Sequence, residues 1–180
     1  MITTSLRDEA LLMLEGKGTI LDVARRVSNA LKARSIAAPV IGGISVVLHQ
    51  YIRTTRDVDL WVPGPLNDVA DCLHAEGATF NSTKREFVIN DVPVHLVTLE
   101  QTGFAPTHLV DIEQIRTVSL ADLISLKLSS GTGSIRRTRD ISDVIGLIEA
   151  NHLNGRFTPK IAKSLRKEFK ELLKGLAREA

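Results

Sequence analysis

The segment from Val40 to Val62, VIGGISVVLHQYIRTTRDVDLWV, limits what this chain can fold into more than any other stretch. It ends in an apolar run typical of a β-strand, and that run carries two aspartates, one residue apart. Strand side chains alternate between faces, so Asp57 and Asp59 should point the same way and Val58 the other. Two carboxylates held side by side repel each other unless a cation lies between them.

Two interpretations of this pair stay open. A hard divalent ion such as Mg²⁺, which takes oxygen ligands, would reconcile the carboxylates. Alternatively, the strand is an exposed edge whose aspartates are solvated or paired with Arg53 and Arg56. The turn at Gly42-Gly43, with Ser45 just inside the next helix, favours the first, because its backbone N–H groups can approach a phosphate closely.

Composition indicates an ordinary globular domain. The 180 residues are 43% hydrophobic and 24% charged, which is usual for such proteins. No apolar run reaches the roughly 18 residues of a membrane span, and the first residues do not resemble a signal peptide. The single cysteine, Cys72, excludes an internal disulfide and a cysteine-based zinc site. We therefore expect a cytoplasmic protein with no membrane partner.

Hydrophobic periodicity predicts helices around a small set of strands. Helices are expected over residues 5–16, 19–35, 44–52, 64–78, 119–133, 138–153 and 160–180, and strands over 39–43, 57–63, 86–90 and 92–100. The last two strands should pair as a hairpin. The predicted class is α/β (α+β), a small mixed sheet flanked by helices. Residues 1–115 would form the core and residues 116–180 a helical C-terminal part packed on it, as one compact unit.

Two later stretches carry candidate site residues. Lys127 shares the apolar stripe of its helix with Leu123 and Leu128, so it either extends to solvent or reaches a negatively charged site. The stretch RRTRDISD has Thr138 as a candidate N-cap, which would place both following aspartates near the positive end of the helix dipole. By helical angle Asp140 flanks the stripe formed by Ile141, Val144, Ile145 and Ile148. Asp143 would lie opposite and pair with Arg137 or Arg139.

These motifs together resemble a known superfamily. The first segment supplies Gly42, Gly43, His49, Tyr51, Arg53, Thr55, Asp57 and Asp59; the later ones supply Leu123, Lys127, Leu128, Arg137, Arg139, Asp140 and Asp143. From about residue 40 to about residue 148 the chain resembles nucleotidyltransferase-fold, DNA polymerase β-like proteins. It looks most like the minimal bacterial branch that includes the AbiEii-type toxins. The resemblance implies a mixed sheet of the nucleotidyltransferase type.

One position departs from that pattern. Many members of the superfamily carry a third carboxylate on a later strand, and the corresponding stretch here, VPVHLV, has His95 instead. A neutral histidine can accept a proton or ligate a softer metal, although a lone strand histidine is more often structural. Glu86 and Asp91 are alternative substitutes, and the resemblance also points to Asp140.

The activity implied is transfer of a nucleoside monophosphate from an NTP to an acceptor hydroxyl. Asp57 and Asp59 would hold Mg²⁺ or Mn²⁺, with Asp57 or Asp140 also activating the acceptor. The turn at Gly42-Gly43 and Ser45 would bind phosphates, while Lys127 and Arg53 neutralise charge on the leaving group.

The resemblance leaves the acceptor open among RNA such as tRNA, a protein and a small molecule, and it also suggests a toxin–antitoxin system with a cognate antitoxin. Residues 151–180 hold eight Lys or Arg against three Glu. Such a basic helix is more often a solvated lysine-rich face, but it is also compatible with a polyanionic partner such as RNA. Two other functions stay open. The chain could be a catalytically weak nucleotide- or RNA-binding module, or a small-molecule nucleotidyltransferase of the antibiotic-modifying kind.

Overall fold

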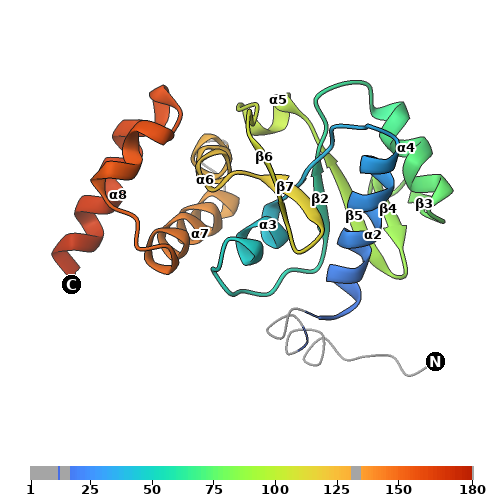
Figure 1. The fold of residues 1–180 in the computed structure, drawn as a ribbon, viewed down its shortest axis with the longest axis horizontal. Coiled ribbons are helices and arrows are strands. Elements are labelled where there is room, and N and C mark those ends of the chain that lie inside the picture. Colours follow the sequence, from blue (N-terminus) through green and yellow to red (C-terminus); the bar gives the residue numbers. More distant parts are fainter. Residues whose placement is uncertain (1–11, 13–16, 131–134, 180) are drawn as a thin grey trace.

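A seven-stranded mixed sheet forms the centre of the computed structural model, which describes residue 12 and residues 17–130 and 135–179 (Figure 1). Its spatial order is β3-β4-β5-β2-β1-β7-β6. The strands are β1 (Val40–Ile41), β2 (Val58–Trp61), β3 (Thr79–Asn81), β4 (Glu86–Ile89), β5 (Val92–Val97), β6 (Leu109–Ile112) and β7 (Ile115–Val118). The pairs β2–β5 and β1–β7 are parallel and the other neighbours antiparallel. The predicted α/β (α+β) class and the β4–β5 hairpin are confirmed.

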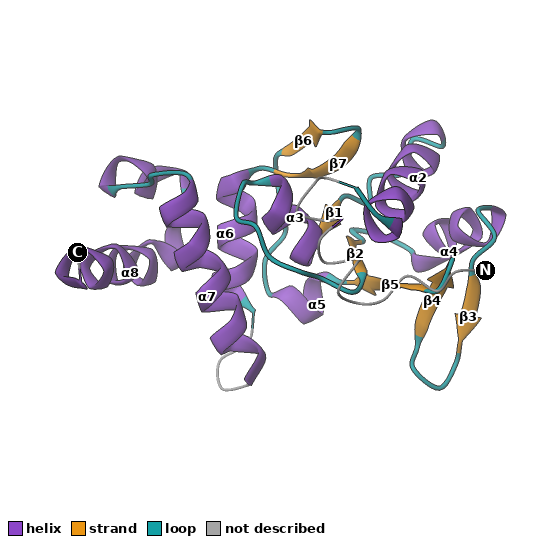
Figure 2. Ribbon diagram, turned by 90° about the horizontal axis from the view of Figure 1, so that it is seen from below, coloured by secondary structure: helices purple, strands orange, loops and turns teal. Residues whose placement is uncertain are grey.

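The helices form two groups, one against the sheet and one that extends away from it toward the C-terminus (Figures 1 and 2). The helices are α2 (Thr19–Ala33), α3 (Gly42–Leu48), α4 (Leu66–Ala75), α5 (Leu99–Thr102), α6 (Leu120–Ser129), α7 (Ile135–Ala150) and α8 (Arg166–Glu179), with 3₁₀ turns at Gly155–Lys160 and Lys163–Leu165. The core under α2 and α4 is separate from the one that α6, α7 and α8 share with α3. No helix in the described part of the chain is long and apolar enough to cross a membrane. The division at residue 115 stays a prediction.

The spacing of apolar residues in helix α2 accounts for the way this helix packs. Its apolar residues recur at three- and four-residue intervals, so they fall on one face of the helix. That face is buried against the sheet, and its members are Ile20, Val23, Ala24, Val27 and Leu31. The helix predicted over 5–16 lies outside the described residues, apart from residue 12.

Three elements were not predicted: β3, α5 and the β6–β7 hairpin. The hairpin joins residues 109–112 to residues 115–118 through Glu113 and Gln114, which both have positive φ, 48° and 68°. A two-residue hairpin turn needs that conformation, and glycine or asparagine normally signals it. The pair Glu-Gln gives no such signal, so the sequence pattern hides the turn.

Helix α3 ends at Leu48, four residues earlier than predicted, and an irregular segment of residues 49–57 leads to β2. Burial alternates along it: Tyr51, Arg53 and Thr55 face inward, while the residues between them are exposed. Such alternation follows from an extended backbone. Tyr51 packs so closely on α7 that a β-carbon at Gly146 would collide with its ring.

This contact predicts the effect of Gly146→Ala. In a helix alanine is favoured over glycine by roughly 1 kcal/mol, but overpacking costs roughly 1–3 kcal/mol. We expect the substitution to lower the free energy of unfolding, measured by urea denaturation, by about 1 kcal/mol. In a Tyr51→Ala background it should instead be stabilising. Stabilisation by Gly146→Ala in the otherwise unchanged protein would contradict the packing described.

Candidate functional site

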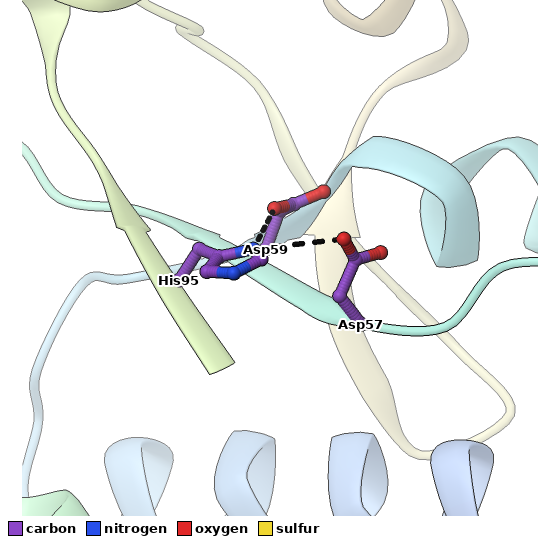
Figure 3. Close-up of side chains that lie close together, drawn as sticks. All are labelled: Asp57, Asp59 and His95. Carbon is purple, nitrogen blue, oxygen red and sulfur yellow. Dashed lines mark hydrogen bonds and ion pairs between the residues drawn. The ribbon is translucent and has the colours of Figure 1, made fainter. Parts of the chain in front are cut away.

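Parallel pairing of β2 with β5 brings two aspartates and a histidine together. In this register Asp59 lies opposite His95, and Asp57 stands immediately before β2. Nδ1 of His95 is 3.2 Å from Oδ1 of Asp59 and 3.6 Å from Oδ2 of Asp57 (Figure 3). The pair predicted to share one face does so, and each carboxylate is about a quarter to a third exposed. Neither aspartate is paired with Arg53, which contacts Asp143 instead.

A third carboxylate, Glu86, lies on the other side of the histidine ring. It comes from β4, which pairs with β5, and its Oε2 atom is 3.2 Å from Nε2 of His95. The hydrogen bond to Asp59 raises the pKa of His95 to about 9, outweighing the effect of burial, with further contributions from Glu86 and Asp57. At neutral pH the ring is therefore an imidazolium that donates from both nitrogens to carboxylates.

The arrangement fits a divalent cation. One ligand atom each from Asp57, Asp59 and His95 can be chosen so that all three lie within 4.8 Å of one another. Carboxylate oxygens suit hard cations and imidazole nitrogen suits transition metals. The protonated ring of His95 offsets negative charge of the surrounding carboxylates. A bound cation would replace it in this role, and the Nδ1 proton would then be released.

Close approach of side chains explains both glycines of the turn. Gly42 has φ +66°, and a β-carbon there would collide with the carboxylate of Asp59. A β-carbon on Gly43 would collide with Thr55, whose hydroxyl donates a 2.8 Å hydrogen bond to Asp57. Gly42 and Gly43, which are the first two residues of α3 and not a separate turn before it, therefore adjoin the carboxylate pair. A side chain at either glycine would displace the groups that form the site.

Ser45 is not part of this cluster. It is fully buried on α3, where its hydroxyl is 2.7 Å from that of Thr117, which in turn donates to the carbonyl of Val40. The residue joins α3 to β7 and β1. His49 plays a similar part at the end of α3, because its Nε2 lies 2.9 Å from the carbonyl oxygen of Val118.

A second cluster of charges joins the segment before β2 to helices α6 and α7. Lys127 lies 2.7 Å from Asp140 and 2.8 Å from Asp143. Arg53 forms a two-pronged contact with Asp143, at 2.7 Å through Nε and 3.0 Å through Nη2. Asp140 also accepts a hydrogen bond from Ser130. The side chains of Lys127 and Asp143 are 12% and 2% exposed, so these pairs are largely removed from water.

The structure corrects the interpretation of Asp143. Helix α7 is already formed at Ile135, so Thr138 lies inside it and is not its N-cap. The inward face runs through Asp140, Asp143, Val144 and Leu147, at three- and four-residue intervals, and Asp143 is buried on it. Both aspartates thus extend the apolar stripe at its N-terminal end. The side chain of Arg137, one predicted partner, lies outside the described residues.

The two clusters meet at Gly43. Nη1 of Arg53 lies 3.0 Å from the place where a β-carbon on Gly43 would stand, next to Thr55. Within the described part of the chain, the carboxylates at ion-pair distance from Lys127 are those of Asp140 and Asp143. Lys127 and Asp140 therefore contact each other, and Lys127 is linked through Asp143 to Arg53, two residues before Thr55 in the segment that leads to β2.

Removing one carboxylate from this buried cluster should lower the free energy of unfolding. Asp143→Asn leaves Lys127 paired with Asp140 but removes the carboxylate that Arg53 contacts, and uncompensated buried charge typically costs about 3–5 kcal/mol. Glu171→Gln, which removes an exposed pair with Lys174 on α8, is the control and should stay within about 0.5 kcal/mol. Urea denaturation of both variants measures the difference. Equal stabilities would show that the cluster does not hold the helices together.

Comparison with solved structures bears on the fold of the chain. A solved nucleotidyltransferase-like protein from Paracoccidioides brasiliensis, described as antigenic, is 17% identical, with a TM-score of 0.50 over 88% of this chain and 87% of its own. That similarity shows the fold. A tRNA-processing enzyme is 16% identical, with a TM-score of 0.40 over 88% of this chain and 47% of its own. No curated protein gives a significant match.

A family model extends the comparison to the sequence itself. The model described as "Nucleotidyltransferase of unknown function (DUF6036)" matches residues 19–173. This span begins at the first residue of α2 and includes the sheet, both charge clusters and most of α8. The chain therefore belongs to this nucleotidyltransferase family.

Proposed function

We propose that the protein is a metal-dependent nucleotidyltransferase that moves a nucleoside monophosphate from an NTP to an acceptor hydroxyl. The observation that carries the proposal is the pair Asp57 and Asp59, held beside the Gly42-Gly43 turn on a strand whose neighbour supplies His95. Family membership and fold support the same chemistry.

In the proposed reaction the acceptor oxygen forms a bond to the α-phosphorus, and the bond from that phosphorus to the bridging oxygen breaks. Pyrophosphate leaves and the hydroxyl proton passes to a carboxylate. Asp57, with its side chain 36% exposed, is the carboxylate that an incoming hydroxyl can reach. Asp140 is already engaged by Lys127 and Ser130. A bound Mg²⁺ or Mn²⁺ would supply electrostatic stabilisation of the phosphate oxygens.

In this proposal Lys127 and Arg53 act mainly by holding the neighbouring segments of the chain in place. The cluster of Arg53, Lys127, Asp140 and Asp143 contains two cationic and two anionic side chains. Within this cluster the charges cancel, so neither of its two cations is unpaired for a triphosphate while these pairs are closed. Holding residues 49–57 in place fixes Thr55 and hence Asp57. Direct contact of Lys127 or Arg53 with phosphate stays a prediction, as does phosphate binding by Gly42 and Gly43.

RNA is the proposed acceptor. Helix α8 and the turn before it expose Lys163, Lys167, Lys170 and Lys174, and such a row of cations attracts a polyanion. Arg166 is committed instead to the carbonyls of Ile161 and Pro159. The AbiEii-type branch and a toxin–antitoxin partner stay predictions from the resemblance.

Label transfer tests the reaction. The protein is incubated with Mn²⁺ or Mg²⁺, total RNA and NTPs carrying ³²P at either the α or the γ position. We expect label from the α position alone to appear on RNA, since γ-phosphate leaves with pyrophosphate. Asp57→Asn and Asp59→Asn should abolish transfer, whereas Asp71→Asn, an exposed carboxylate on α4, should not. Label on the protein would shift the acceptor from RNA to a polypeptide.

The second candidate is a nucleotide-binding module without transfer activity, and His95 in the third carboxylate position favours it. In that case no label moves with any NTP. Added NTP should nonetheless raise the melting temperature, because a ligand of the folded state stabilises it.

A further inference from the structure

The third position of the metal centre is filled by an imidazole where an additional carboxylate would serve a Mg²⁺ site. We propose that Asp57, Asp59 and Nδ1 of His95 form a three-ligand centre that prefers a first-row transition-metal ion, such as Mn²⁺, to Mg²⁺, with Glu86 orienting the ring. The inference deepens the proposed function and rests on it for the expectation that a cation binds. It adds which class of ion the site selects and which residue outside the ligand set controls the selection.

The chemistry of the three ligands favours a transition-metal ion over Mg²⁺. Mg²⁺ binds oxygen almost exclusively and gives up its water reluctantly, whereas an imidazole nitrogen gives transition-metal ions a stronger bond. Two carboxylates and a neutral imidazole provide two negative charges, one fewer than three carboxylates would. The smaller charge weakens attraction to Mg²⁺, and the nitrogen ligand compensates for that loss only with a transition metal.

The orientation of the ring carries the second step. Nδ1 faces both aspartates, while Nε2 faces Glu86 at 3.2 Å. A carboxylate behind a ligating histidine fixes its tautomer and raises the basicity of the coordinating nitrogen. Glu86 suits this role because its side chain is 11% exposed, with Lys84 3.7 Å from its second oxygen. When Glu86 accepts a hydrogen bond from Nε2–H, Nδ1 is the nitrogen that is free of a proton and can bind the metal.

The backbone carries the third step. His95 and Glu86 stand on β5 and β4, adjacent strands inside the sheet, and Asp59 stands on β2 on the other side of β5. Strand pairing therefore sets the spacing of Asp59 and His95, and Asp57 stands immediately before β2. Asp91, the other acidic residue suggested as a substitute, lies in the β4–β5 turn.

Metal binding without nucleotide tests the inference separately from transfer activity. Dissociation constants for Mn²⁺ and Mg²⁺ are measured by titration calorimetry, and pulsed EPR of the Mn²⁺ complex detects coupling to an imidazole ¹⁴N nucleus. The wild-type complex should show that coupling and His95→Asp should lose it. The preference for Mn²⁺ over Mg²⁺ should fall in His95→Asp, because an oxygen ligand replaces the nitrogen that favours transition-metal ions.

Variants of the orienting residue complete the experiment. Glu86→Gln should weaken Mn²⁺ binding by about 10- to 100-fold, while the exposed control Glu171→Gln should leave it unchanged. Far-UV circular dichroism confirms that each variant is folded. Absence of nitrogen coupling in the wild-type Mn²⁺ complex, or an equal metal preference in wild type and His95→Asp, would overturn the inference. Neither result would bear on label transfer, and a failed transfer assay would leave the metal preference standing.

Discussion

Parallel pairing of β2 with β5 is the constraint on which the site depends. It places Asp59 opposite His95, and the antiparallel β4 then adds Glu86 on the far side of the ring. Three carboxylates in one small region would repel each other, so a positive charge has to lie among them. The imidazolium supplies that charge here, and the same geometry suits a divalent cation. The Gly42-Gly43 turn follows from this packing, because only residues without side chains leave room for Asp59 and Thr55.

The second charge cluster extends this arrangement across the molecule. Arg53 and Thr55 lie on the same inward face of the segment before β2; Arg53 binds Asp143 on α7, and Thr55 binds Asp57. Lys127 on α6 completes the link between the two helices. Besides their apolar core, the C-terminal helices are thereby joined by ion pairs to the segment that carries Thr55 and leads to Asp57.

The spacing of apolar and polar residues predicted the elements whose structure depends on neighbouring residues in the sequence. Period-two alternation identified β2 and the shared face of its aspartates, and three- and four-residue spacing identified α2, α6 and the outline of α7. Among the features that escaped are a hairpin turn at Glu113-Gln114 without glycine or asparagine, the true start of α7, and the burial of Asp143. A charged residue on the inward face of a helix can be predicted only if its partners are known. The partners of Asp143 are Arg53 and Lys127, which lie in distant segments of the sequence. The place of Ser45 in a buried hydrogen bond to Thr117 likewise depends on strand β7, which the pattern did not reveal.

In the proposed site the carboxylate pair and His95 surround one cation. Crystals of the protein grown with Mn²⁺ and a non-hydrolysable NTP, measured at the manganese absorption edge, locate that ion directly. We expect an anomalous peak at bonding distance from one oxygen each of Asp57 and Asp59 and from Nδ1 of His95. A peak elsewhere, or none while the His95 ring still contacts Asp59, would contradict it.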